Sequence, residues 1–166
     1  AVRNLKSAVR DQESTAKIAM SKAAYLAGKA INITRTTACH AVSYPITAHF
    51  GVPHGHAVAL TLPPMFLYNS NVTEKDSRDA RGAAYVKTAM QELVELLEAS
   101  DARGVKTKLE HLMDNIGLER KLSVLGIREP EYIELIIKNG FNPERVGNNP
   151  RVLTAESLRD MLEHIL

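Results

Sequence analysis

Four of the six histidines in the sequence lie between residues 37 and 56, at His40, His49, His54 and His56. Histidine is the commonest metal ligand in proteins and the usual side chain for proton transfer near neutral pH. The four imidazoles lie on both sides of a Gly-Val-Pro turn that apolar residues flank. A solvated loop or an ordinary core helix rarely combines these features, so we expect the function to reside here.

Two of these histidines could share one metal ion. His40 and Tyr44 are four residues apart, so they point to the same side of a helix. His54 follows His40 by 14 residues, and two helices joined by a tight turn would bring the imidazoles together. Catalytic zinc or ferrous iron usually takes three or more protein ligands, and the aspartates of the chain lie in amphipathic, solvated segments. The spacing fits half of a metal site, and it fits two structural histidines equally well.

The other candidates in the sequence have simpler interpretations. His56 could reach the same site, but its simpler interpretation is a neighbour on the first turn after the Gly-Val-Pro segment. His49 packs locally or faces solvent. His111 and His164 lie among charged residues and are expected on the surface. The single cysteine, Cys39, points to a different helix face from the histidine beside it and is expected to be a buried, inert thiol.

Helical periodicity runs through most of the chain, and no segment has the alternation of a β-strand. Pro45 could kink or delay one helix, and the pair Pro63-Pro64 should interrupt or bend the next. The fold class predicted is all-α. We predict helices over residues 1–10, 14–31, 38–50, 54–70, 77–100, 101–116, 118–125, 130–138 and 154–165.

The segment before the last predicted helix has two interpretations. Asn148, Asn149 and Arg151 could contact another domain, but a solvated loop is the simpler account. Thr154 is the expected N-cap of the helix that follows, because threonine accepts hydrogen bonds from the first backbone N–H groups.

The composition describes an ordinary globular domain. The chain has 166 residues, 45% of them hydrophobic and 24% charged, with a net charge of +2. Basic and acidic residues are interspersed without a basic stripe, which argues against nucleic acid as a partner. A single cysteine allows no internal disulfide, and the sequence has neither a membrane-length apolar run nor the profile of a secretion signal. These features favour the cytoplasm.

Residues 39–69, CHAVSYPITAHFGVPHGHAVALTLPPMFLYN, resemble the signature of the iron-dependent (group III) alcohol dehydrogenases. That family carries a pattern close to H-x-x-x-H-x-hydrophobic-G, then P-H-G-x-A, then L-P and N. The preceding AMSKAAYLAGKAIN and the terminal GNNPRVLTAESLRDMLEHIL are also similar to family segments. The resemblance extends over nearly the whole chain.

The resemblance implies the fold and the ligands. Residues 1–166 would form the C-terminal all-helical domain of a two-domain enzyme, a fragment without its N-terminal nucleotide-binding domain. His40 and His54 match the two later metal ligands of the family, and the metal would be Fe²⁺ or Zn²⁺. The other two ligands, an Asp and a His, would precede Ala1. NAD or NADP would bind mainly to the missing domain, so the fragment alone should be inactive.

Tyr44 departs from the family pattern. Many members have a second histidine at this position, near the substrate and the nicotinamide. A phenol there can still donate a hydrogen bond, so Tyr44 is the candidate catalytic residue, with a core tyrosine as the alternative. The tyrosine version, followed by proline and a His-Gly-His turn, resembles the phosphonate-pathway aldehyde reductases.

Two other functions remain open at this point. One is a non-catalytic helical interaction module with structural histidines, and the other is a zinc-dependent polyol dehydrogenase of the same superfamily. The enzyme interpretation implies hydride transfer between a nicotinamide and a small alcohol or aldehyde. It also predicts that an apolar face near residues 40–60 lies uncovered without the missing domain, which would favour a homo-oligomer.

Overall fold

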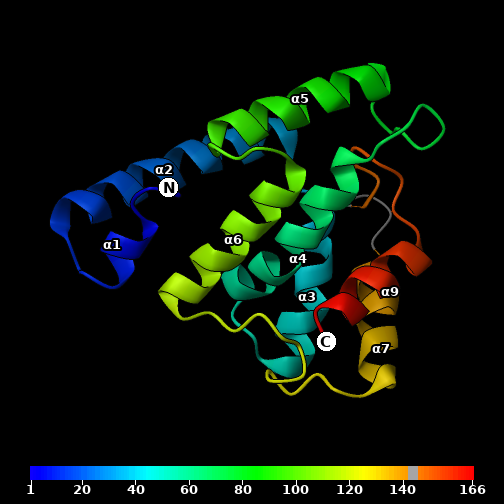
Figure 1. The fold of residues 1–166 in the computed structure, drawn as a ribbon. Helices are drawn as coiled ribbons and strands as arrows, with labels where there is room; N and C mark the ends of the chain where they lie inside the picture. The colour runs from blue at the N-terminus through cyan, green and yellow to red at the C-terminus, as the bar shows by residue number, and fades with distance from the viewer. Residues whose placement is uncertain (142–145) are drawn as a thin grey trace.

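The computed structural model describes residues 1–141 and 146–166, and this part of the chain is helical with connecting turns and loops (Figure 1). Its only β-type pairing is an isolated bridge between Ser77 and Arg151. The predicted all-α class is confirmed. The helices are α1 (Leu5–Val9), α2 (Ser14–Thr34), α3 (Ala38–Phe50), α4 (His54–Ser70), α5 (Gly82–Leu96), α6 (Ala102–Ile116), α7 (Pro130–Gly140) and α9 (Ala155–His164).

Helices α3 and α4 form the centre of the domain, with α7 against α3, and α6 and α9 against α4 (Figure 1). A second apolar cluster joins α4 to α5 and α6, and α5 crosses one end of the molecule. The central helices therefore carry most of the packing that fixes the candidate site. The fully buried large side chains of the main cluster are Val42, Ile46, Leu60, Met65, Leu122, Ile127, Ile136, Leu158 and Leu162.

Helix α3 begins at Ala38 and continues through Pro45, so the proline causes no late start. The helix ends at Phe50, and the capping residue Gly51 has a left-handed φ of 69° and donates its N–H to the carbonyl of Thr47. Glycine adopts this conformation without a Cβ clash, which makes it the usual residue at a helix C-terminus. The connection over residues 51–53 is only three residues long, and buried Val52 anchors it in the core.

Helix α4 is a single helix that includes Pro63 and Pro64, so of the two expected outcomes, an interruption or a bend, the prolines do not cause the interruption. Each proline removes one backbone hydrogen bond from the helix. The buried side chains of Leu60, Met65 and Phe66 hold α4 in both apolar clusters, and tertiary packing of this kind outweighs local propensity.

The short helix predicted over 118–125 is wrong, because this segment is a loop and a series of turns. Leu122 is buried, and its N–H donates to the carbonyl of Ile165 at the C-terminus. Tertiary contacts therefore satisfy the backbone here in place of a helix. The helix predicted over 77–100 is also shorter, since Ser77 pairs with Arg151 before α5 begins.

The segment before α9 is not simply a solvated loop: Asn148 is exposed, but Asn149 and Arg151 bond to α4 and to the loop after it, and we call these contacts the clamp. Asn149 is completely buried and exchanges two side-chain hydrogen bonds with Asn69 of α4, of 2.8 and 3.2 Å. Arg151 pairs with Asp76 at 2.7 Å and lies over the ring of Tyr68. The clamp fixes the C-terminal end of α4.

The expected N-cap of α9 is confirmed. The hydroxyl of Thr154 accepts from the N–H of Ser157, and the hydroxyl of Ser157 accepts from the N–H of Thr154. This reciprocal pair is a capping box, which satisfies two backbone donors that the helix itself leaves without partners.

The uncovered apolar surface lies on α2 rather than near residues 40–60. In the central region the exposed large apolar side chains are Tyr44 and Leu62, each less than half exposed. Helix α2 packs mainly against α1, so most of its surface faces solvent. The exposed apolar side chains of α2 are Ile18, Tyr25, Leu26, Ile31 and Ile33.

Among the residues that the structure describes, no helix combines the length and the apolar character that crossing a membrane requires.

Candidate metal centre

The structure brings His40 and His54 together at the start of the central helix pair. His40 lies in the first turn of α3, and His54 is the first residue of α4. Their ring centroids are 5.5 Å apart, and the rings are inclined by 59°. The three-residue connection between the helices thus places residues that are distant in sequence side by side, as their spacing predicted.

This separation fits two imidazoles on one ion. With metal–nitrogen distances of about 2.1 Å and a tetrahedral angle between the bonds, two imidazole centroids stand about 5 Å apart. The observed 5.5 Å is close to that value. His40 is half-buried and His54 is exposed, so a ligand from outside the chain can reach the pair. The donor set also suits the metal, since neutral imidazole binds both zinc and ferrous iron.

Tyr44 lies beside the pair, one helical turn after His40. Its ring centroid is 5.7 Å from that of His54, within the usual range for packed aromatic rings. The side chain is 46% exposed, which excludes the alternative of a core tyrosine. The tyrosine ring therefore lies at the surface of the site, beside His54.

Ser43 is the site residue that sequence reasoning missed. It is fully buried on α3, and its hydroxyl lies 2.8 Å from the carbonyl oxygen of His40 and 3.2 Å from Nδ1 of His54. Its position three residues after His40 puts it near the histidine face of α3, and that spacing was the one available indication. Serine is common inside helices, so the spacing alone would not have selected it.

His56 has a separate contact. Its Nε2 lies 2.6 Å from the backbone carbonyl oxygen of Glu119, and a carbonyl only accepts, so Nε2–H is the donor. This bond ties the first turn of α4 to the loop after α6. His56 therefore supports the backbone around His54.

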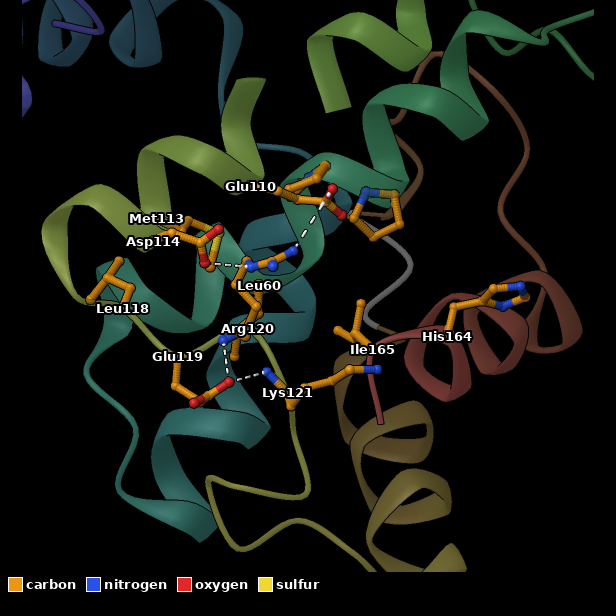
Figure 2. A pocket seen from close by; sticks show the side chains of 12 residues that line it. Leu60, Glu110, Met113, Asp114, Leu118, Glu119, Arg120, Lys121, His164 and Ile165 are labelled. Atoms are coloured by element: carbon orange, nitrogen blue, oxygen red, sulfur yellow. Dashed lines mark hydrogen bonds and ion pairs between the residues drawn. The ribbon is translucent and has the colours of Figure 1, made fainter. Parts of the chain in front are cut away.

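Figure 2 shows the pocket of about 250 Å³ that this loop helps to line. Its lining includes the apolar Leu60 and Ile165 and the charged Arg120, which pairs with Asp114 at 2.7 Å. The carboxylate of Glu119 accepts from two backbone N–H groups in the same view. None of the site residues described above lines this pocket. The histidine pair instead occupies an open surface beside the turn.

The remaining candidates lie where their simpler interpretations placed them. His49, His111 and His164 are exposed. Cys39 is buried on α3, and burial raises the pKa of its thiol to about 11, because a thiolate is poorly solvated there. The thiol is therefore inert at neutral pH.

The described residues do not complete a metal site. In residues 1–141 and 146–166, no three side chains of His, Cys, Asp or Glu are grouped closely enough to hold an ion. A catalytic metal usually needs at least three protein ligands, so the pair would need donors from elsewhere. Fold and site together define an all-α domain that presents two convergent imidazoles on an accessible surface.

Comparison with known proteins identifies the family. The sequence pattern described as the Fe-containing alcohol dehydrogenase family, C-terminal, matches residues 1–166. The chain therefore belongs to the iron-containing alcohol dehydrogenase family and corresponds to its C-terminal part.

Individual relatives agree with this assignment. Phosphonoacetaldehyde reductase of Streptomyces viridochromogenes is 30% identical over 154 residues, which are 90% of this chain and 36% of that protein. The NAD-dependent methanol dehydrogenase of Bacillus methanolicus is 26% identical, over 97% of this chain and 41% of that protein. An alcohol dehydrogenase from Oenococcus oeni shares the fold, with a TM-score of 0.72 and 22% identity over 99% of this chain and 44% of that one. The chain spans about two fifths of the length of these relatives.

Proposed function

We propose that this chain is the helical domain of an NAD(P)-dependent, metal-dependent alcohol dehydrogenase or aldehyde reductase. The observation that carries the proposal is the 5.5 Å approach of His40 and His54 on an accessible surface, in a chain of the iron-containing alcohol dehydrogenase family. The relatives named above act on alcohols or aldehydes by their names. A nucleotide-binding domain and further metal ligands would come from the rest of the protein.

His40 and His54 are the metal-binding residues in this proposal. A bound Fe²⁺ or Zn²⁺ would supply Lewis acidity toward the oxygen of a carbonyl or an alcohol. The chain itself positions the two imidazoles: α3 holds His40, and the short turn with buried Val52 holds His54 at the start of α4. Hydride transfer is the chemistry of the nicotinamide, which NAD or NADP would provide from the other domain.

Tyr44 is the proposed catalytic residue. Its ring packs 5.7 Å from that of His54, and its exposed side chain can approach a small substrate at the pair. The phenol O–H would donate a hydrogen bond to the substrate oxygen, which orients it and stabilises developing negative charge. Removal of the hydroxyl should therefore lower turnover more than substrate binding.

The proposed partners follow from the same arrangement. They are a small alcohol or aldehyde, the nucleotide-binding domain, and a second copy of the protein in a homo-oligomer. The exposed apolar side chains of α2 support the two protein contacts, because apolar patches of this kind usually lie in interfaces. The relative named phosphonoacetaldehyde reductase supports a small aldehyde as the substrate class.

Activity of the whole protein tests the proposal. Oxidation of NADH and NADPH is followed with a panel of small aldehydes, after loading with Fe²⁺ or Zn²⁺. His40→Ala and His54→Ala should each lower kcat/KM by about 100- to 1000-fold, as expected when a group that stabilises transition-state charge is lost. His49→Ala is the matched control, because His49 is an exposed histidine on the same helix as His40. Equal activity in all three variants would reject the histidine pair as the metal site.

A further inference from the structure

Ser43 stands between the two histidines and contacts both. Its side chain is fully buried in α3, and its Oγ lies 2.8 Å from the carbonyl oxygen of His40 and 3.2 Å from Nδ1 of His54. The first contact links the hydroxyl to its own helix, and the second links it to the first residue of α4. The hydroxyl therefore lies at the junction of the two helices that carry the candidate ligands.

Proton counting fixes the direction of both hydrogen bonds. A hydroxyl has one proton to donate and two lone pairs that accept, whereas a backbone carbonyl only accepts. The contact with the His40 carbonyl is the shorter one, and only the proton of Ser43 can satisfy it. Toward His54 the hydroxyl is then an acceptor, so the ring nitrogen Nδ1 must carry the proton.

We propose that Ser43 is a positioning residue that holds His54 in the Nδ1–H tautomer, so that Nε2 is the nitrogen that would bind the metal. A neutral imidazole has one N–H and one free lone pair, so protonation at Nδ1 leaves Nε2 as the only possible ligand atom. This inference rests on the metal site proposed above, and it adds the residue and the atom that prepare His54.

The geometry explains why a buried serine suits this place. Ligating histidines in proteins almost always donate their second N–H to an oxygen, and this contact fixes the orientation of the ring. His54 is exposed and begins a helix, and its ring packs against the rings of His40 and Tyr44. Ser43 is completely buried and its rotamer is held by the bond to the His40 carbonyl, so it offers His54 a fixed acceptor.

Nitrogen NMR of the metal-free chain, labelled with ¹⁵N-histidine, tests the tautomer directly. Long-range ¹H–¹⁵N correlations of a neutral imidazole distinguish its protonated ring nitrogen from its unprotonated one. His54 should show a protonated Nδ1 and an unprotonated Nε2. A predominant Nε2–H form for His54 in the unaltered chain would overturn the proposal, whatever the variants do.

Ser43→Ala supplies the second test. The variant should move His54 toward the Nε2–H form that an unrestrained histidine prefers, and should lower Zn²⁺ affinity by about 10- to 100-fold in calorimetric titration of the whole protein. Ser70→Ala is the matched control, since Ser70 is a helical serine bonded to the carbonyl of Phe66 at the other end of α4. An unchanged His54 tautomer in folded Ser43→Ala would overturn the proposal.

The NMR of the His54 tautomer and the calorimetric Zn²⁺ titration together distinguish a failure of the Ser43 inference from a failure of the proposed metal site. If the metal proposal fails, His40→Ala and His54→Ala retain full Zn²⁺ affinity, but the tautomer of His54 still responds to Ser43→Ala. If the Ser43 inference fails, the tautomer is insensitive to Ser43 while both histidines still contribute to affinity. A general loss of structure would change the spectra of all six histidines and not only that of His54.

Discussion

The buried amide pair Asn69–Asn149 gives a sharp prediction about the clamp on α4. Asn149 donates to Oδ1 of Asn69 at 2.8 Å and to the carbonyl of Arg151 at 2.7 Å, and it accepts from Nδ2 of Asn69 at 3.2 Å. Asn149→Ala removes all three bonds and leaves the amide of Asn69 buried without them. Each unsatisfied buried polar group costs about 1–3 kcal/mol, so the expected loss is about 3 kcal/mol or more.

Urea unfolding followed by circular dichroism measures this loss. With a slope of about 2 kcal/mol per molar urea, a loss of about 3 kcal/mol lowers the midpoint by about 1.5 M without changing the slope. The matched control is Asn148→Ala, which removes exposed bonds to the carbonyls of Thr34 and Thr36 and should cost about 1 kcal/mol or less.

A double-mutant cycle tests the reasoning itself. Asn69→Ala and Asn149→Ala should be strongly coupled, by about 1–3 kcal/mol, because the double variant removes both side-chain amides and so leaves neither of them buried without its partner. Additive effects of the two substitutions, or a cost of Asn149→Ala no greater than that of Asn148→Ala, would refute the account of the clamp.

Three further predictions concern other parts of the fold. Hydrogen bonds from the backbone of Thr73, and then from Arg151, hold the pKa of Asp76 at about 2, below its ordinary 3.8. The contribution of the Asp76 carboxylate to the free energy of unfolding is therefore complete above pH 3.8 and is lost as the pH falls toward 2. Asp76→Asn should flatten the pH dependence of the free energy of unfolding in this range. Cys39 should react with iodoacetamide at pH 8 only when the chain unfolds, since burial raises its thiol pKa to about 11; rapid labelling of native protein would contradict this. Gly140 of α7 packs against α3, and a Cβ added to it would lie 3.1 Å from a backbone atom of α3. Gly140→Ala should therefore lower the free energy of unfolding, measured in urea, by about 1–3 kcal/mol. A more stable variant would show that α3 and α7 can move apart.

The sequence was sufficient for the fold class and for the approach of the two histidines. Helical periodicity and the Gly-Val-Pro segment are local features, and local features determine where α3 ends and α4 begins. The spacing of His40, Tyr44 and His54 then placed the three rings together across that turn.

The sequence was insufficient where distant contacts decide the structure. Residues 118–125 have helical character, but the buried Leu122 bonds to the C-terminal segment and the backbone follows that contact. Asn149 looks like a loop residue until Asn69, eighty positions earlier, is seen to pair with it. Ser43 was missed for a similar reason, since its role depends on a nitrogen from the following helix.

The surface of α2 illustrates another limit. The uncovered apolar face was predicted near residues 40–60, where the function was sought, but α3 and α4 bury most of their apolar side chains in the core. The exposed residues lie on α2, whose alanine-rich sequence resembles that of a packed helix. A sequence pattern indicates that a face is apolar, and only the structure shows which faces are covered.

Metal titration of this chain tests the central claim most directly. Calorimetry with Zn²⁺, or with Fe²⁺ under anaerobic conditions, should show weak binding at one site, since two imidazoles provide only part of the usual shell. His40→Ala and His54→Ala should each abolish that binding, and His49→Ala should leave it unchanged. Undiminished affinity in either of the first two variants would contradict the account.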